Sequence, residues 1–351
     1  MMNLTIGITV YNRMDTLRRM IRSLFASKPD HDGVEWIIRV YDDCSDEFDE
    51  NDIRTIFPVE IDYHRHEKNH GSDYNIGFMY RSFLETGDDI LFNCDSDLIF
   101  DKDWISAIQK HLPETDGVLS LFNTQGHKTI NTVGDLCIKD DVGSAGCAMT
   151  REAVELICNN IGEKDSHSSL DYNWCSLFGK LGKKIYCTSR SYVQHIGFDG
   201  FNSSNGVMDI GDGFRVGGSV NGQILGDVLY DIVSRKNSES SGQRNFVYLF
   251  PYDKVPYGSS VVIYGAGVVG MDYRRQLEMT GYCNKLIQVD KNYTRHKDVC
   301  STDILSDIEC DYVVIAANLM NVRQEMREDI LKINSQLKSK LIDDVCRIMR
   351  F

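Results

Sequence analysis

The acidic segment Asp95-Ser96-Asp97 has the residue types and spacing that most directly suggest chemistry. Its two carboxylates lie one residue apart and follow an apolar run at residues 90–92. Two like charges this close cost free energy unless a cation neutralises them. Carboxylate oxygens are ligands that Mg²⁺ and Mn²⁺ prefer, and either ion also binds diphosphates. The segment therefore predicts a divalent-cation site, with an Asp-rich turn as the alternative interpretation.

Hydrophobic periodicity predicts the elements that must position this pair. Residues 4–10 and 35–41 have the apolar character of buried strands, and residues 17–25 carry an apolar stripe at helical spacing, with Asp15 as the expected N-cap. A strand, a helix and a strand in this order predict a parallel sheet, whose ligands bind beyond the carboxyl ends of its strands. The segments that follow these strands, residues 9–13 and 42–46, are therefore expected beside the acidic pair.

The composition excludes several classes of protein. The 351 residues contain 38 Lys and Arg against 52 Asp and Glu, a net charge of −14, which disfavours extended contact with nucleic acid or anionic lipid. Eleven cysteines occur without a Cys-x-x-Cys pair, which argues for reduced thiols rather than a zinc or redox motif. The sequence shows neither a signal peptide nor a run of ~20 apolar residues, so we expect a cytoplasmic protein with no transmembrane segment.

Several segments, in their order along the chain, resemble the motifs of glycosyltransferase family 2, the inverting enzymes of the GT-A fold. The resemblance covers about residues 3–200. The segments that carry it are Thr9-Val10-Tyr11-Asn12-Arg13, Asp42-Asp43-Cys44-Ser45, Asp73-Tyr74-Asn75-Ile76-Gly77, Asp95-Ser96-Asp97, Leu170-Asp171 and Gln194-His195. The chain departs from the family where Tyr74 replaces an arginine and Leu170 replaces an acid.

The resemblance implies roles for individual residues. Asp97 would be the most direct metal ligand, with Asp95 and His195 beside it and Mn²⁺ or Mg²⁺ as the ion. Asp171 would be the general base; a helix N-cap is its alternative role, and a structural role stays open for His195. The residues that would bind the nucleotide are Thr9, Tyr11, Asn12, Arg13, Asp42, Asp43, Gly71, Asn75, Asp95 and Ser96.

The activity that the resemblance implies is metal-dependent, inverting transfer of a sugar from a nucleotide sugar, UDP-linked by analogy, to an acceptor hydroxyl. The acceptor would be a carbohydrate or a lipid-linked molecule of bacterial surface polysaccharide or glycoconjugate assembly, and a lipid-linked acceptor would bring the protein to a membrane. Residues 119–148 and the glycine-rich stretch at 198–222, a lid or a surface loop, are expected to select donor and acceptor.

A second glycine motif, Gly265-x-Gly267-x-x-Gly270, follows an expected strand at 261–264 and opens an expected helix. Asp290 follows a further strand, as in a dinucleotide-binding turn. The unit from residue 259 onward is short for a complete dinucleotide-binding enzyme. Two interpretations therefore stay open: a nucleotide site, and a scaffold that orients the enzyme or makes it a homo-oligomer.

The predicted fold class is α/β: a GT-A nucleotide-diphospho-sugar transferase domain with a mixed, mainly parallel sheet, then a small Rossmann-like α/β domain. We expect the first domain at 1–200, a Gly-rich loop, helix and linker at 201–254, and the second domain at 255–351. Two other functions stay open. One is an NAD-linked sugar-nucleotide oxidoreductase or epimerase, and the other is a non-catalytic nucleotide-sugar-binding protein.

Overall fold

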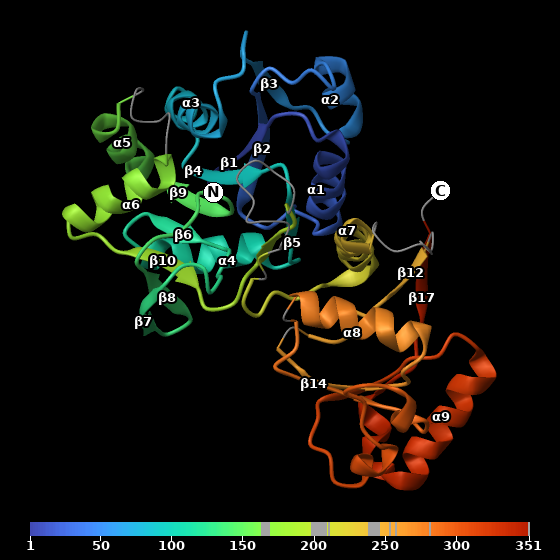
Figure 1. Cartoon of the computed structure of the whole chain (residues 1–351). Helices are drawn as coiled ribbons and strands as arrows, with labels where there is room; N and C mark the ends of the chain where they lie inside the picture. The colour runs from blue at the N-terminus through green and yellow to red at the C-terminus, as the bar shows by residue number, and fades with distance from the viewer. Residues whose placement is uncertain are drawn as a thin grey trace. The chain divides into compact units, whose positions relative to one another are not determined.

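The chain divides into two compact units, Met1–Gly197 and Phe198–Phe351 (Figure 1). This computed structural model describes residues 1–162, 169–197, 209, 211–237, 246–252, 254–256, 258–280 and 282–349. Much of the glycine-rich stretch and of the expected linker lies outside the described residues, and the domain limits at 200 and 254 stay predictions. Helix α7 (Gly218–Asn237) begins inside the glycine-rich stretch expected to be a loop, so that prediction is wrong at residues 218–222. Buried Ile224, Leu225 and Val228 lie at helical spacing and favour the helix.

A mixed nine-stranded sheet forms the centre of the N-terminal unit, which agrees with the predicted fold class. The pairs β3–β2, β2–β1, β1–β4 and β6–β10 are parallel. The pairs β4–β9, β9–β6, β10–β8 and β8–β7 are antiparallel. The carboxyl ends of β2, β1 and β4 therefore share one edge. The strands in spatial order are β3 (Asp62–Arg65), β2 (Val34–Asp42), β1 (Met2–Val10), β4 (Ile90–Asp95), β9 (Cys147–Thr150), β6 (Val118–Ser120), β10 (Ile185–Thr188), β8 (Leu136–Lys139) and β7 (Thr129–Val133).

Helices bury apolar side chains against both faces of this sheet. Two of them, α1 (Met14–Ala26) and α4 (Trp104–His111), pack in one cluster. The second cluster contains residues of α3 (Ser72–Leu84), α5 (Arg151–Asn160) and α6 (Leu170–Lys180). Strand β4 contributes side chains to both clusters, because its consecutive residues point to opposite faces: Phe92 packs in the first cluster and Leu91 in the second. A short helix, α2 (Glu50–Ile56), follows β2 and is capped by Asp49.

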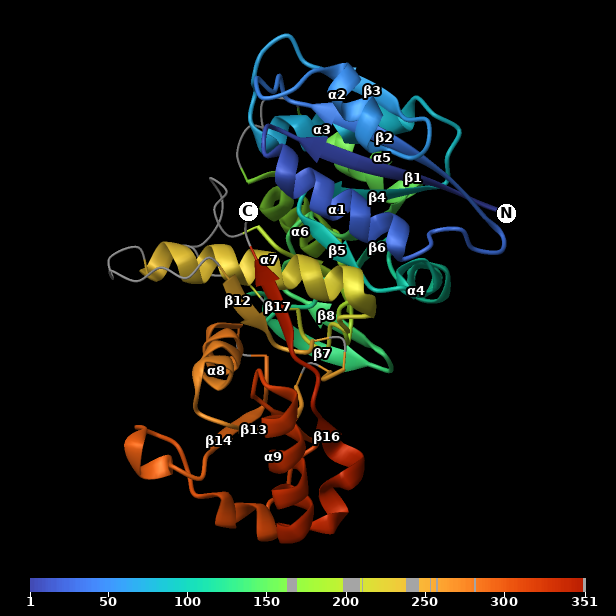
Figure 2. The ribbon, with the colours of Figure 1, turned by 90° about the vertical axis from the view of Figure 1, so that its right-hand side faces the viewer.

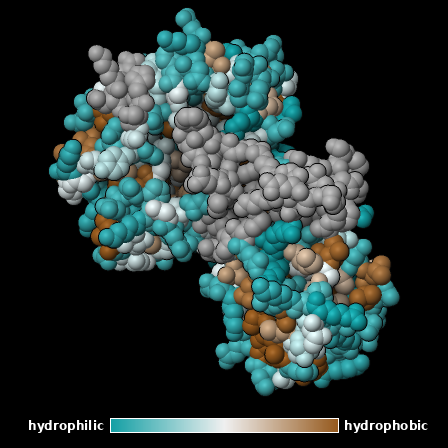
Figure 3. Space-filling model, in the orientation of Figure 1, coloured by the Kyte–Doolittle hydropathy of each residue, from teal (hydrophilic) through white to brown (hydrophobic). Residues whose placement is uncertain are grey.

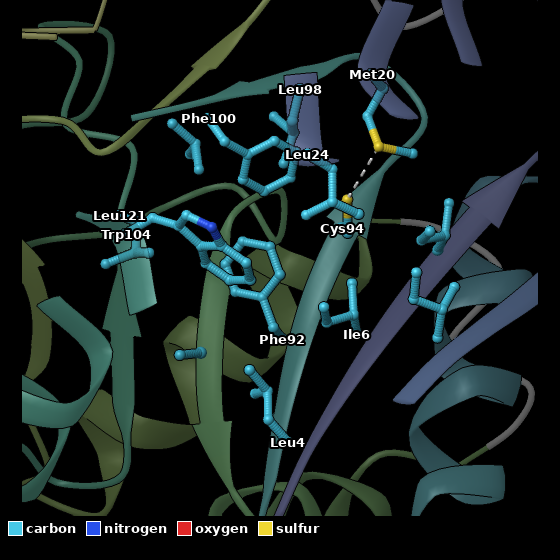
Figure 4. Packing of buried hydrophobic residues seen from close by; sticks show 14 of the residues in the cluster. Leu4, Ile6, Met20, Leu24, Phe92, Cys94, Leu98, Phe100, Trp104 and Leu121 are labelled. Carbon is cyan, nitrogen blue, oxygen red and sulfur yellow. Dashed lines mark hydrogen bonds between the residues drawn. The ribbon is translucent and has the colours of Figure 1, made fainter. Parts of the chain in front are cut away.

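Cys94 precedes the acidic pair but points into the first cluster, as Figure 4 shows. Its Sγ atom lies 4.0 Å from Sδ of Met20, among buried side chains of β4 and α1. Burial raises the pKa of this thiol well above its usual value. Cys94 is therefore a core residue and lies on the opposite side of the strand from the carboxylate of Asp95.

Helix α1 begins at Met14, and its N-cap position is Arg13 rather than the predicted Asp15. Asn12 and Arg13 both have left-handed backbone conformations, with φ of 52° and 62°. The backbone amides of Arg13 and Met14 donate to Oε2 of Glu47, at 2.8 Å and 3.4 Å. A carboxylate from another loop thus satisfies two backbone amides at the start of the helix, where amides lack partners inside the helix.

The C-terminal unit contains a four-stranded, fully parallel sheet, in the order β14 (Lys285–Val289), β13 (Ser260–Tyr264), β15 (Tyr312–Ile315) and β16 (Leu341–Ile342). Helix α8 (Val268–Thr280) follows the glycine turn, and α9 (Met320–Ile333) follows β15. Strands β12 (Phe246–Leu249) and β17 (Cys346–Met349) lie side by side as a separate antiparallel pair (Figure 2). Among the described helices of the chain, none is long and apolar enough to cross a membrane.

Candidate active site

Three potential metal ligands meet at the carboxyl edge of the N-terminal sheet. Asp95 is the last residue of β4, and Asp97 precedes the short strand β5 (Leu98–Phe100). His195 ends strand β11 (Val193–His195), which pairs antiparallel with β5 so that His195 lies opposite Leu98. One ligand atom from each of Asp95, Asp97 and His195 lies within 4.8 Å of the others. The β5–β11 pairing thus brings together side chains that are about 100 residues apart in the sequence.

The charges of this triad are strongly coupled. Burial and the charge of Asp97 raise the pKa of Asp95 above its usual range. Burial would also raise the pKa of Asp97, but His195 and Arg13 hold it below its usual range. Burial lowers the pKa of His195, but the charge of Asp97 outweighs that effect and raises this pKa to about 9. The two buried carboxylates therefore favour a positive charge beside them, either on the imidazole of His195 or on a bound cation.

The donor set fits a divalent cation. Asp97 is only 4% exposed, and its Oδ1 accepts no hydrogen bond of normal geometry within the described residues, although Nε2 of His195 lies 3.0 Å away. A buried carboxylate oxygen that lacks a well-aligned donor is stabilised by a further positive partner. Its other oxygen lies 3.0 Å from Nη1 of Arg13. Two carboxylates and one imidazole are a donor set that Mn²⁺ accepts readily.

Gly197 is a residue of this site that sequence reasoning did not single out. A Cβ atom at this position would overlap Oδ2 of Asp97 and would lie 2.8 Å from Cε1 of His195. Only glycine therefore lets the chain pass this close to both ligands. The sequence did carry a hint of this role, because a glycine two residues after the expected ligand His195 can let the backbone pass close to that ligand.

The substitution Gly197→Ala is expected to displace Asp97 or His195 and to weaken Mn²⁺ binding by ~10–100-fold, as loss of a supporting contact around a metal typically does. Titration of the protein with Mn²⁺, followed by electron paramagnetic resonance of the free ion, measures this change. Gly87→Ala is a suitable control for replacement of a glycine, because Gly87 has no left-handed backbone conformation and a Cβ there meets no atom within 4 Å. Equal affinity in Gly197→Ala and the unchanged protein would show that the ligands tolerate the methyl group.

The loops that follow β1 and β2 hold each other through hydrogen bonds. The backbone amide of Asn12 donates to Oγ of Ser45 at 2.8 Å, and Oδ1 of Asn12 accepts the amides of Asp46 and Glu47 at 2.9 Å and 3.2 Å. The Asn12 side chain therefore connects the two loops. Tyr11, in contrast, is 45% exposed beside them, which leaves its ring able to stack on a base.

Asp42 and Asp43 differ in their surroundings although they are neighbours. Asp42 is fully buried, and its carboxylate accepts hydrogen bonds from Ser45, from the Tyr63 hydroxyl at 2.6 Å and from Arg65 at 2.7 Å. Asp43 accepts the backbone amides of the residues at the start of α3, His70 at 2.9 Å and Gly71 at 2.7 Å. Burial raises the pKa of Asp43. Asp42 thus supports the loop, and a contact to a base stays a prediction for both.

The start of α3 supplies further residues to this edge. Asn75 is buried; its Nδ2 donates to the carbonyl oxygen of Tyr41 at 2.8 Å, and its Oδ1 lies 3.1 Å from Nε2 of His66. This amide therefore ties α3 to β2. Tyr74 stands where the resemblance leads us to expect an arginine, and its ring stacks on that of His70 with centroids 4.2 Å apart. The two half-buried rings form a flat face next to Gly71.

The remaining predicted nucleotide ligands lie beside the metal triad. Thr9 is half-buried and lies opposite Asp95 in the register of β1 and β4. Ser96 is buried between Asp95 and Asp97. The three loops after β1, β2 and β4 and the start of α3 thus gather all the predicted nucleotide-binding residues at one edge of the sheet. Their contact with a nucleotide remains a prediction.

Asp171 lies in the first turn of α6, whose N-cap position is Ser169, so the N-cap role considered for Asp171 is wrong. Its Oδ1 instead accepts the adjacent amide of Tyr172 at 2.8 Å. Burial raises the pKa of Asp171, the charge of Asp73 adds to the increase, and the charge of His127 opposes it. A half-buried carboxylate with a raised pKa has the character of a general base.

His127 and Asp141 form a second polar pair near Asp171. Nδ1 of His127 lies 2.7 Å from Oδ1 of Asp141. The buried Lys139 donates from Nζ to the carbonyl oxygens of Thr124 and His127, at 3.1 Å and 2.9 Å, and so fixes the turn that carries this histidine. No sequence spacing indicated this pair, because its members come from two loops that meet only in the folded chain.

In the C-terminal unit, the fold brings the second glycine motif and Asp290 together. Gly265 has φ of 121°, and a Cβ at Gly270 would overlap the carbonyl oxygen of Gly265, so both positions require glycine. Oδ2 of Asp290 accepts the amide of Ala266 at 2.8 Å. Hydrophobic residues, coloured brown, gather in patches on the face of this unit seen in Figure 3. Nucleotide binding and self-association both remain predictions for this unit.

Comparison with known proteins points to one family. Residues 5–136 match the model of Glycosyl transferase family 2. One similar solved structure is S. aureus TarS, at 14% identity and a TM-score of 0.40, with 69% of this chain and 41% of that chain covered. Another is TarS 1–349 in complex with UDP, at 14% identity and a TM-score of 0.40, with 69% of this chain and 67% of that chain covered. A third is TarS 1–349 in complex with UDP-GlcNAc, at 14% identity and a TM-score of 0.39, with 69% of this chain and 68% of that chain covered. The chain thus spans about two fifths of the longer TarS chain, at 41%. No curated protein matches the chain. The match to glycosyl transferase family 2 thus lies within the N-terminal unit, at whose sheet edge the motifs stand in order.

Proposed function

We propose that this protein is a metal-dependent, inverting glycosyltransferase that moves a sugar from a UDP-sugar to an acceptor hydroxyl. The observation that carries the proposal is the cluster of Asp95, Asp97 and His195 in a family 2 domain. Asp171 lies close enough to Asp95 for its charge to raise the pKa of that residue. A metal site and a half-buried carboxylate near each other are the two parts that such a transfer requires.

Each group has a distinct task in the proposed reaction. Asp97, Asp95 and His195 would hold Mn²⁺ or Mg²⁺. When bound, the ion supplies positive charge that offsets the negative charge of the nucleoside diphosphate leaving group. Tyr11 offers an exposed ring for the base, and Asp43 fixes the start of α3 beside it. Arg13 adds a guanidinium group at the same edge.

Asp171 would take the proton of the acceptor hydroxyl on one of its carboxylate oxygens. The hydroxyl oxygen would then form its bond to the anomeric carbon as the bond to the diphosphate breaks, in a single displacement that inverts this centre. The turn with His127 and Asp141 lies within residues 119–148, the segment expected to select donor and acceptor. We propose that this turn contacts the acceptor.

The proposed acceptor is a carbohydrate or a lipid-linked molecule of bacterial surface polysaccharide or glycoconjugate assembly. Ten cysteines of the described residues are free thiols, which supports a reducing compartment such as the cytoplasm. A lipid-linked acceptor would place the reaction at the membrane surface. The C-terminal unit would bind a nucleotide at its glycine turn or would join copies of the chain.

Thermal shift measurements test the donor class. UDP with Mn²⁺ is expected to raise the melting temperature, because a ligand that binds only the folded state stabilises it, whereas UDP without the metal should have little effect. Stabilisation by NAD⁺ alone would favour the oxidoreductase or epimerase. Release of UDP from a panel of UDP-sugars then separates an enzyme from a non-catalytic binder, which would bind UDP but release none from any donor.

A further inference from the structure

The start of helix α3 makes carboxylate–amide hydrogen bonds to two other segments: the loop after β2 and the first turn of α6. On its N-terminal side, the carboxylate of Asp43 accepts the amides of His70 and Gly71. On its other side, the carboxylate of Asp73 accepts the amide of Ser169 at 2.8 Å and that of Leu170 at 3.3 Å. These two amides open helix α6, whose second residue is Asp171. The same turn of α3 therefore contacts the expected nucleotide loop and the helix that carries the expected base.

We propose that Asp73 is a positioning residue for Asp171: it holds the first turn of α6 against α3 and so couples the nucleotide-binding end of α3 to the base. This inference rests on the proposed function. It assigns to Asp73 a task beyond its place in the segment at residues 73–77 that carries the family resemblance.

The geometry of α6 explains why an external carboxylate is needed. Ser169 occupies the N-cap position with φ of 54°, a left-handed conformation, and its side chain makes no capping hydrogen bond. The first amides of a helix lack partners inside the helix and are satisfied by side chains, water or ligands. Asp73 satisfies two amides at this end, and its negative charge also suits the positive end of the helix dipole. Without Asp73, the turn that carries Asp171 loses these two hydrogen bonds to α3.

The charge of Asp73 also acts on Asp171 directly. Several titratable or charged groups face Asp171 from the elements around it: Asp73 and Tyr80 of α3, Asp95 of β4, His127, Cys147 of β9 and Cys175 of α6. Burial raises the pKa of Asp171 most, Asp73 raises it further, and His127 lowers it. Removal of the Asp73 charge should therefore lower the pKa of Asp171, so that the base stays ionised at lower pH.

The variants Asp73→Asn and Asp73→Ala separate the effect of the hydrogen bonds to the α6 amides from the effect of the Asp73 charge on Asp171. Asparagine keeps one acceptor oxygen and removes the charge, whereas alanine removes both. A displaced base commonly costs up to ~100-fold in rate. We therefore expect kcat of Asp73→Ala to fall ~10–100-fold with the donor KM nearly unchanged, and kcat of Asp73→Asn to fall less. In Asp73→Asn, the acidic limb of the kcat profile should move to lower pH.

Asp49→Asn is a matched control, because Asp49 also accepts two helix amides, those of Asn51 and Asp52, at the start of α2. It should lower the melting temperature to a similar extent without moving the pH profile. If Asp73→Ala does not fold, Asp73→Ser keeps a short acceptor and serves in its place.

A measurement that needs no turnover separates this inference from the proposed function. In protein with ¹³C-labelled aspartate carboxyls, the Asp171 resonance is expected to titrate at lower pH in Asp73→Asn than in the unchanged protein. Hydrogen exchange of the amides at 169 and 170 should also be faster in Asp73→Ala. An unchanged Asp171 titration together with unchanged exchange would overturn the positioning role, whether or not the protein transfers sugar. Absence of turnover with every donor would count against the proposed function alone.

Discussion

Asp97→Ala is expected to lower kcat/KM for sugar transfer by ~10²–10³-fold or more, the usual effect of losing an electrostatic group that acts in the transition state. Asp97 is buried, contacts both Arg13 and His195, and carries the carboxylate oxygen without a normal hydrogen-bond donor. The substitution therefore removes the centre of the metal triad. Calorimetric titration with Mn²⁺ should show the loss of binding, and UDP should no longer stabilise the protein in the presence of Mn²⁺.

Asp135→Asn is the control for Asp97→Ala, because Asp135 is an exposed carboxylate paired with Lys110 on the surface. It should keep both Mn²⁺ binding and turnover. Circular dichroism would establish that Asp97→Ala is folded. Mn²⁺ affinity in folded Asp97→Ala equal to that of Asp135→Asn would rule out Asp97 as a ligand.

Asp171→Asn is expected to lower kcat by ~10²–10⁴-fold, the range typical for loss of a general base, while the donor and Mn²⁺ still bind. The amide keeps the shape of the side chain but cannot accept the hydroxyl proton. Because burial and Asp73 raise the pKa of Asp171, the carboxylate ionises at higher pH than an ordinary aspartate. The rate of the unchanged enzyme should therefore rise with pH through this raised pKa and then level off.

Steady-state kinetics over pH with a fixed UDP-sugar and acceptor measures both effects. Asp116→Asn is a matched control, because Asp116 likewise accepts a backbone amide, that of Lys184 at 2.8 Å, but makes no contact with the metal triad in the described structure. It should keep the rate and the pH profile. Full activity in Asp171→Asn would exclude Asp171 as the base.

The order of the motifs along the chain was sufficient to predict which sheet edge carries the site. Residues that directly follow parallel strands share an edge whatever the rest of the fold does. The sequence alone therefore predicts that Asp42, Asp95 and the loop at 9–13 lie together, and β1, β2 and β4 bring them to one edge. The expected Rossmann-like order of the C-terminal unit rests on the same regularity of strand, turn and helix.

The roles of neighbouring carboxylates could not be separated in this way. Asp42 and Asp43 look alike in the sequence, but Tyr63 and Arg65 reach Asp42 from the next strand, β3. Similarly, the N-cap expected at Asp15 failed because Glu47, from the loop after β2, takes the amides that begin α1. In both cases the decisive partner lies more than 20 residues away.

The sequence by itself predicted the strands that became β1, β2 and β4, the helix between the first two, and the edge at which polar residues gather, because hydrophobic periodicity is a local property and the carboxyl ends of parallel strands share an edge. Only the tertiary structure decided that His195 meets Asp97, through the pairing of two three-residue strands too short to predict. It also decided that Gly197 must lack a side chain and that Asp73 holds the helix of Asp171. The physical reason is that hydrogen bonds and charge interactions depend on distances between loops, and the packing of the whole unit sets those distances.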